Sequence, residues 1–214
     1  MRVLERAEEP ELRKAVIGAL GEINSPEAAP AIARGLRDRD AEIRLAAAEA
    51  LGSIGERGSV SALLDAIKDS NAEVRHAVVS ALGQLADRRA VGAFAAALSD
   101  TDVEVRRAAA EAFGNLENQR VAPPELLRAL NDRDAEVRHS VAHALGHIED
   151  PDAISALVVH VRDASVEVRR AVVEALDNFD DPSVTTALRN ALRDEDAEVR
   201  HAAAKALGNR NRSK

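Results

Sequence analysis

The sequence predicts an all-α fold: a right-handed α-solenoid, or superhelix, of about seven two-helix repeats of 31 residues, the first of them truncated. The first observation is an arginine that recurs along the 214-residue chain with successive spacings of 31, 31, 31, 32, 31 and 31 residues. The second is a run of apolar and small residues at helical spacing after each arginine, and the third is a helix-capping residue before it. A fixed period of this length indicates one supersecondary unit whose copies bury their apolar faces against each other. The seven arginines are Arg13, Arg44, Arg75, Arg106, Arg138, Arg169 and Arg200.

Each arginine lies near the start of a helix that we call helix B. If the arginine is numbered zero, apolar or small residues occupy positions −1, +2, +3, +6, +7 and +10, which lie on one helical face. A glutamate at position −2 suits the positive end of the helix dipole. Helix B is therefore predicted to begin at position −3, and the first one to span Pro10 to Leu20. Position −4 is a good N-cap in the six later repeats: Asp40, Asn71, Asp102, Asp134, Ser165 and Asp196.

A glycine at position +8 is predicted to end helix B in the left-handed conformation. Only Asp177 departs from this pattern. The glycines are Gly21, Gly52, Gly83, Gly114, Gly146 and Gly208.

A shorter helix, helix A, is predicted before each capped turn, so that every repeat holds two antiparallel helices. Its start is marked by an N-cap followed by proline at Ser25-Pro26, Asp150-Pro151 and Asp181-Pro182. Pro123 and Pro124 explain the one 32-residue interval, because they delay helix A and leave residues 117–122 as a longer loop. Residues 1–9 are too short for a loop and a helix A. The uncovered first helix B is therefore predicted to fray or to support end-to-end association through the N-terminal repeat, and the sequence leaves the oligomeric state open.

The unbroken period predicts one repeat domain over residues 1–214. The chain has no run of 18 apolar residues and no signal-peptide pattern, so we expect a soluble, cytoplasmic protein. It has no cysteine, which excludes disulfides and thiolate metal sites. The formal net charge of −8 and an aromatic content of three phenylalanines argue against nucleic-acid and membrane binding.

Three features together resemble HEAT-like repeats of the phycobilisome-lyase type, and also artificial alpha-helicoidal repeat proteins. They are the Ile-Arg or Val-Arg pair, the Ala-Leu-Gly ending of helix B and an aspartate at position −6, and the resemblance covers roughly residues 3–208. It implies that the B helices line a concave surface and that aspartate and arginine form a ladder between repeats. The family includes bilin lyase subunits, deoxyhypusine hydroxylase and adaptors. The six aspartates are Asp38, Asp69, Asp100, Asp132, Asp163 and Asp194.

The histidines are the only candidates for a metal site. His139 and His143 are four residues apart and could chelate a metal from one helical face, but no third ligand is evident. Gly146 is expected to end the helix, so that the ring of His147 swings away. In the hydroxylases of the resembled family, position +1 carries the histidine of a His-Glu dyad. Here alanine or serine follows each histidine at that position, so we expect no metal, no cofactor and no catalytic residue.

Two other motifs are interpreted as structural. Asp38-x-Asp40-x-Glu42 has the spacing of a calcium loop but lacks the glycine that such a loop needs at its sixth position. Gly55-Glu-Arg-Gly58 has the spacing of a phosphate-clamping loop, but the repeat register makes it a turn between helices.

Positions −2, +1 and +5 of helix B are three and four residues apart and share one exposed face. We call them the variable stripe, because +1 and +5 differ between repeats while −2 is always glutamate. Its acidic character favours a protein or peptide partner with basic residues. Terminal repeats usually serve as caps, so His201 and Lys205 are expected to matter less than the central residues. The candidate partner-binding residues are His76, Arg107, Glu111, His139, His143, Arg170 and Glu174.

The sequence therefore favours a noncatalytic protein-binding scaffold or adaptor. Two alternatives stay open. The resemblance allows an accessory lyase-type or metal-dependent protein-modifying role, and a stability scaffold without a ligand, natural or designed, is the other.

Overall fold

The computed structural model describes residues 9–116 and 119–212, and all regular secondary structure within these ranges is helical. Contacts divide the chain into two compact units, Met1–Leu116 and Glu117–Lys214. Each unit is a stack of two-helix repeats, which confirms the predicted all-α solenoid. The single domain over residues 1–214 stays a prediction, and the truncation of the first repeat concerns residues 1–8, which lie outside the described ranges.

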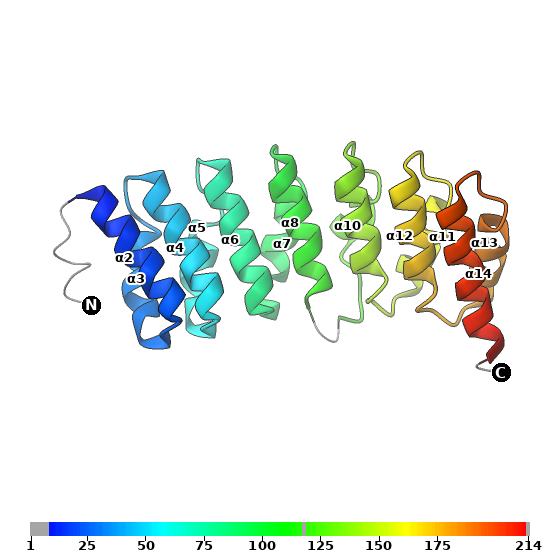
Figure 1. Cartoon of the computed structure of the whole chain (residues 1–214), viewed down its shortest axis with the longest axis horizontal. Helices are drawn as coiled ribbons and strands as arrows, with labels where there is room; N and C mark the ends of the chain where they lie inside the picture. The colour runs from blue at the N-terminus through cyan, green and yellow to red at the C-terminus, as the bar shows by residue number, and fades with distance from the viewer. Residues whose placement is uncertain (1–8, 117–118, 213–214) are drawn as a thin grey trace. The chain divides into compact units, whose positions relative to one another are not determined.

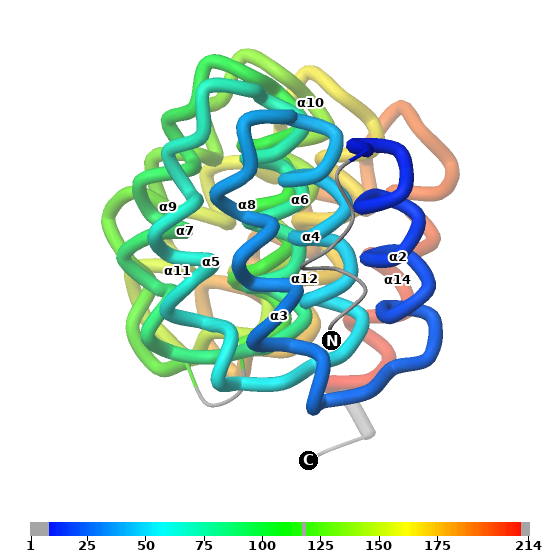
Figure 2. The backbone as a smooth tube through the Cα atoms, turned by 90° about the vertical axis from the view of Figure 1, so that its left-hand side faces the viewer, coloured from blue at the N-terminus to red at the C-terminus, as the bar shows by residue number. Residues whose placement is uncertain are grey.

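In the first unit, each B helix packs on the next and each A helix packs on the B helix that follows it (Figure 1). In this unit the A helices form one layer and the B helices form the other, as the end-on view in Figure 2 shows. A 3₁₀ turn opens each A helix: η1 (Pro26–Ala28), η2 (Arg57–Ser59) and η3 (Arg88–Ala90). The A helices are α3 (Ala29–Gly35), α5 (Val60–Ala66) and α7 (Val91–Ala97). The B helices are α2 (Pro10–Ile23), α4 (Ala41–Ile54), α6 (Ala72–Leu85) and α8 (Val103–Gly114).

The second unit follows the same plan, with α10 packed on α12 and α12 on α14. Its A helices are α9 (Pro124–Ala129), α11 (Pro151–His160) and α13 (Pro182–Ala191). Its B helices are α10 (Ala135–Leu145), α12 (Val166–Leu176) and α14 (Ala197–Arg212). Every B helix in the two units thus begins at position −3, as the sequence predicts.

Side-chain caps fix these starting points. The carboxylate of Asp102 accepts hydrogen bonds from the backbone N–H groups of Glu104 and Val105, and Asn71 caps α6 in the same way. The core lies between the layers and consists of leucine, valine, isoleucine and alanine, with three phenylalanines, two of which form a pair. The rings of Phe94 and Phe113 meet edge to face at 5.7 Å between centroids.

The prediction that the position +8 glycine ends helix B in the left-handed conformation is wrong, because even α8, which ends at Gly114, has a right-handed cap at Asn115 (φ −82°). Helices α2, α4 and α6 run through this glycine for two more residues and end at a left-handed residue, Asn24 (φ 55°), Gly55 (φ 70°) or Ala86 (φ 47°). Gly146 does follow the last residue of α10, but it keeps a right-handed helical conformation with φ −61°.

Close packing of consecutive B helices explains the glycine instead. A methyl group added at Gly21 would lie 2.9 Å from the Cβ of Ala50, and one added at Gly146 would lie 2.8 Å from that of Ala175. Because real Cβ atoms essentially never approach so closely, any side chain here would push the two helices apart. The glycine therefore sets the distance between B helices at Gly21, Gly52, Gly83 and Gly146.

The loop predicted over residues 117–122 is confirmed where the structure describes it, since α9 begins at Pro124 and residues 119–123 are not helical. Residues 117 and 118 lie outside the described ranges. Asp150 ties this loop to the next repeat. Its Oδ2 accepts a 2.7 Å hydrogen bond from the N–H of Ala122, while Oδ1 caps α11 at the N–H of Asp152. The Asp150 side chain is buried, so the loop has a fixed attachment.

Candidate functional site

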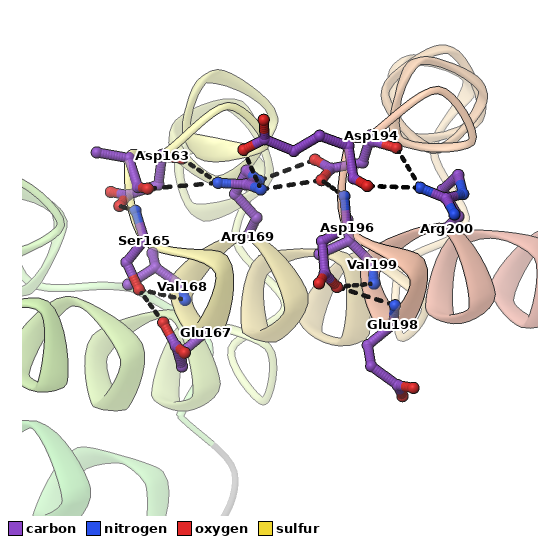
Figure 3. A network of polar contacts seen from close by, with 12 residues as sticks. Asp163, Ser165, Glu167, Val168, Arg169, Asp194, Asp196, Glu198, Val199 and Arg200 are labelled. Atoms are coloured by element: carbon purple, nitrogen blue, oxygen red, sulfur yellow. Dashed lines mark hydrogen bonds and ion pairs between the residues drawn. The ribbon is translucent and has the colours of Figure 1, made fainter.

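The arginines and aspartates of the repeat form the predicted ladder inside each unit. Arg44 donates from Nε and Nη2 to both carboxylate oxygens of Asp69, at 2.6 and 2.8 Å, and from Nη1 to the Asp38 carbonyl at 3.0 Å. This is the bidentate geometry of a strong charge-assisted pair. Figure 3 shows the same arrangement around Arg169 and Asp194. The two-point pairs are Arg44–Asp69, Arg75–Asp100, Arg138–Asp163 and Arg169–Asp194.

The ladder carboxylates are held in their charged form. The hydrogen bond from Arg44 lowers the pKa of Asp69 below its ordinary value, although burial acts in the opposite direction. Asp100 beside Arg75 and Asp194 beside Arg169 have lowered pKa values for the same reason. These groups therefore belong to the frame that joins consecutive repeats.

The variable stripe lies on the B helices beside this frame. In the first unit His76 and Arg107 are half-buried and Glu111 is exposed. In the second unit His139 is half-buried, whereas His143, Arg170 and Glu174 are exposed. Each predicted residue is therefore at least partly accessible, and the set is divided between the two units.

Charges on the stripe are paired more than the sequence suggests. Arg107 donates to Glu104 from Nε at 3.1 Å and contacts Glu111 at 3.4 Å. Between repeats, the Nζ of Lys14 lies 2.7 Å from Glu42. Two of the glutamates at position −2 are therefore paired with cations at position +1, Glu104 on its own helix and Glu42 with the preceding one.

A groove of about 310 Å³ lies between α12 and α14. Arg170 and Glu174 line it on α12, and His201 and Lys205 line it on α14. The sequence interpretation missed the last two as site residues because it assigned them to a terminal cap. Their repeat positions could have identified them, because His201 and Lys205 occupy the same positions, +1 and +5, as Arg170 and Glu174 on the other wall of the groove.

A second groove, of about 430 Å³, lies between α2 and α4 in the first unit. Gly18 lines it on α2 and Glu49 on α4, both at position +5. Position +5 therefore lines a groove between two consecutive B helices in both units.

The histidines at the end of α10 are not arranged as the sequence predicts. His147 does not turn away, because its ring meets that of His143 edge to face at 5.0 Å between centroids. The turn after Leu145 continues in a right-handed conformation at Gly146, and this keeps the two rings together. In the parts of the chain that the structure describes, no group of three or more His, Cys, Asp or Glu residues could hold a metal ion. The absence of a metal site stays a prediction.

The two other motifs have structural roles in the first unit. Asp38 Oδ1 accepts from the N–H of Asp40, and Asp40 accepts from the N–H of Glu42, each at 2.9 Å, so these carboxylates organise a helix start. Gly55 is the left-handed cap of α4, and Glu56 accepts from the N–H of Gly58. This segment is the turn between helices that the sequence predicts.

No helix in the described ranges is long and apolar enough to cross a membrane.

Comparison with known proteins relates this architecture to one family. A model described as HEAT repeats matches residues 1–72, 60–124, 122–164 and 159–214. No curated protein sequence matches the chain. Among solved structures, a chain from the complex of CpcE and CpcF of phycocyanin lyase from Nostoc sp. PCC7120 shares 27% identity with a TM-score of 0.64, and the match covers 86% of this chain and 76% of that one.

Two further solved structures share the fold. YibA of Escherichia coli has 22% identity and a TM-score of 0.67, over 97% of this chain and 80% of that one. An engineered protein has 22% identity and a TM-score of 0.65, over 97% of this chain and 67% of that one. The same repeat frame therefore occurs in natural and in engineered chains.

Proposed function

Because the chain belongs to the HEAT-repeat family, we propose that it is a noncatalytic protein-binding scaffold or adaptor that holds its partner on the variable stripe of its B helices. HEAT repeats generally mediate protein interactions. The proposal assigns no catalytic residue and no cofactor to the chain.

The groove between α12 and α14 carries this proposal. Its walls hold acidic Glu174, Asp177 and Glu198 beside basic Arg170 and Lys205. These groups stand on helices whose buried faces and ladder residues are fixed by packing, so that side chains at positions +1 and +5 can vary without altering the fold. A rigid frame with variable exposed groups is suited to selective recognition.

The partner is a protein or peptide with basic residues that face the three carboxylates, and with at least one acidic group for Arg170 or Lys205. Interfaces of this kind draw specificity and association rate from charge complementarity. Nucleic acid is a poor match because the groove is acidic and the chain carries a net charge of −8.

The experiment is an affinity capture from the source organism followed by a binding assay with the purified partner. Replacement of both Arg170 and Glu174 by alanine is expected to weaken binding at least about tenfold, equivalent to 1.4 kcal/mol. The control replaces Glu125 and Arg128, an exposed ion pair on α9 with a contact of 2.8 Å. Equal affinity of the two double variants would contradict the assignment to the stripe and leave a scaffold without a ligand at this surface.

A second candidate is an accessory lyase-type role. It is favoured by the 27% identity to the chain from the phycocyanin lyase complex. The test is to incubate the chain with a phycocyanin subunit and its free bilin and to follow covalent attachment by absorbance and mass. Attachment that depends on the chain would support the lyase role, whereas binding of the subunit without attachment would support the scaffold.

A further inference from the structure

The first and the last described B helices carry matching surfaces. At most contacts between consecutive B helices, the position +8 glycine of one helix lies against the position +6 alanine of the next, as in Gly52 against Ala81 and Gly83 against Ala112. Helix α12 has Asp177 at this position instead. The first B helix, α2, has no described B helix before it. The last described B helix, α14, has none after it. Each therefore exposes one half of the contact that is buried elsewhere.

The exposed half on α2 is an apolar stripe, which we call the leading face. It consists of Leu12, Ala15, Ala19 and Ile23. Leu12 is 47% exposed and Ile23 is 70% exposed. The residues that correspond to Leu12 in the other repeats are at most 1% exposed, and those that correspond to Ala19 are at most 5% exposed. An apolar stripe of this length on a helix is normally covered.

The exposed half on α14 is the trailing face, formed by Ala204, Leu207 and Gly208. Ala204 is exposed, whereas its counterparts at position +4, from Ile17 to Val173, are at most 1% exposed. A methyl group added at Gly208 would meet nothing within 4 Å, in contrast to the tight contacts at Gly21 and Gly146. The trailing face thus keeps the small residues that close helix packing requires.

The charges beside the two faces are opposite. Arg200 and Lys205 are exposed on α14, which also carries exposed Glu198, and Glu9 and Glu11 are exposed at the start of α2. Glu9 occupies the N-cap position of α2, but its side chain does not cap the helix, unlike the aspartates of later repeats.

The pair between Lys14 and Glu42 shows the register of such charges, since position +1 of one repeat meets position −2 of the next at 2.7 Å. The same register places His201 opposite Glu11 of another molecule.

We propose that α2 of a second copy of this chain docks on α14, with Ala19 of one copy against Gly208 of the other. The contact reproduces the internal packing of consecutive B helices, and stripe residues of the two copies meet beside it as Lys14 meets Glu42 within the chain. One element is missing: position −6 of the first repeat is Ala7, where every later repeat has aspartate. The contact therefore lacks a ladder pair and is weaker than the internal ones. Because the two faces differ, association is head to tail and produces chains or a closed ring.

The test is sedimentation velocity of the full chain from micromolar to millimolar concentration, with one arginine substitution on each face. The wild-type chain is expected to show a mass that rises with concentration. Ala19→Arg and Ala204→Arg are each expected to remain monomeric, because each lacks one of the two faces that every contact needs. Circular dichroism checks that both variants are folded. Ala96→Arg, at an exposed alanine of α7, is the matched control and should associate like wild type.

Mixing the two variants makes the test specific. Ala19→Arg keeps a trailing face and Ala204→Arg keeps a leading face, so an equimolar mixture is expected to form heterodimers and nothing larger. Gly208→Ala should weaken wild-type association at least about tenfold, since its added methyl group would clash with Ala19 of the second copy. The proposal is overturned if wild type stays monomeric at millimolar concentration. It is equally overturned if one face variant alone still dimerises, which would indicate a symmetric contact between like ends.

Discussion

Arg44 and Asp69 are 25 residues apart in the chain and share two hydrogen bonds of 2.6 and 2.8 Å. The third donor group of the same arginine, Nη1, binds the carbonyls of Asp38 and Arg39 in its own repeat. One guanidinium therefore fixes the turn before its own helix and the turn of the next repeat together. This double role explains why the arginine recurs although it faces neither the core nor the variable stripe.

The ladder is predicted to contribute strongly to stability. Arg75→Ala should lower the free energy of unfolding by about 1 to 3 kcal/mol, because it leaves the carboxylate of Asp100 largely buried without its partner. A double-mutant cycle of Arg75 and Asp100, followed by urea unfolding, measures the coupling. The control cycle uses Arg37 and Asp65, whose side chains are 79% and 68% exposed and whose coupling should be about 0 to 1 kcal/mol. Equal coupling in the two cycles would contradict a structural ladder.

Stability is predicted to fall in acid. The pKa values of Asp69, Asp100 and Asp194 are lowered in the folded chain by their arginine partners. A carboxyl whose folded pKa is lowered stabilises the protein above its unfolded pKa, near 3.9, and this contribution is lost as the pH falls from there through the folded pKa. Thermal melting from pH 7 to pH 2 should show a steep loss below about pH 4. Asp69→Asn should make stability depend less on pH in this range. An unchanged pH dependence in this variant would contradict a contribution from the ladder carboxylate.

The position +8 glycines are predicted to respond differently to alanine. Gly146→Ala should destabilise the chain by about 1 to 3 kcal/mol, because its methyl group would lie 2.9 Å from the backbone Cα of Ala175. Gly208→Ala, measured on the dilute monomer, should be neutral or stabilising by up to about 1 kcal/mol, since alanine is the better helix former and the space is open. Chemical denaturation of both variants gives the comparison. A loss of stability at Gly208 as large as at Gly146 would exclude helix spacing as the reason for the glycine.

Partner binding at the groove between α12 and α14 is predicted to depend on salt. Its five charged residues are at the surface and are screened over a Debye length of about 8 Å at physiological ionic strength. Affinity should fall steadily as sodium chloride is raised, mainly through slower association. The Arg170→Ala and Glu174→Ala double variant should show a smaller dependence. An affinity independent of salt in the wild-type chain would point to an apolar surface instead.

The first B helix is predicted to be less protected than an inner one. Leu12 and Ile23 are exposed on α2, whereas the matching positions of α8 and the turn after it, Val105 and Leu116, are at most 5% exposed. Hydrogen exchange at low protein concentration should therefore be faster over residues 10–23 than over residues 103–114. Equal protection of the two helices in a monomer would be inconsistent with an uncovered end.

Most of the helical frame could be predicted from the sequence because each repeat has the same kinds of capping, apolar and ladder residues at the same positions. The caps at Asp102 and Asn71 can be recognised from neighbouring residues alone. The ladder aspartates can be recognised from one fixed spacing in the sequence. The sequence could not show whether Gly21 is a helix cap or a contact residue, since a left-handed cap and a close helix contact both favour glycine. Only the distance to Ala50 distinguishes them.

The candidate site was less predictable. Position +5 identified Glu174 as exposed, but the groove that it shares with Lys205 depends on the gap between two packed helices. The contact between His143 and His147 depends on the conformation of the intervening turn, which the glycine at 146 leaves open in the sequence. Charge pairing between Lys14 and Glu42 likewise requires the register of one helix against the next.

The 25-residue step from arginine to aspartate also determines how such a chain can change length. If residues 45–75 were deleted, Arg44 would precede Asp100 by the same 25 residues that now separate it from Asp69, and an equivalent arginine, capping residue and glycine would follow in register. Duplication of the same block would likewise create no new kind of junction. Unequal recombination that joins equivalent positions of two repeats would therefore keep this register, so that the number of stripe positions can evolve in whole repeats without a redesigned core.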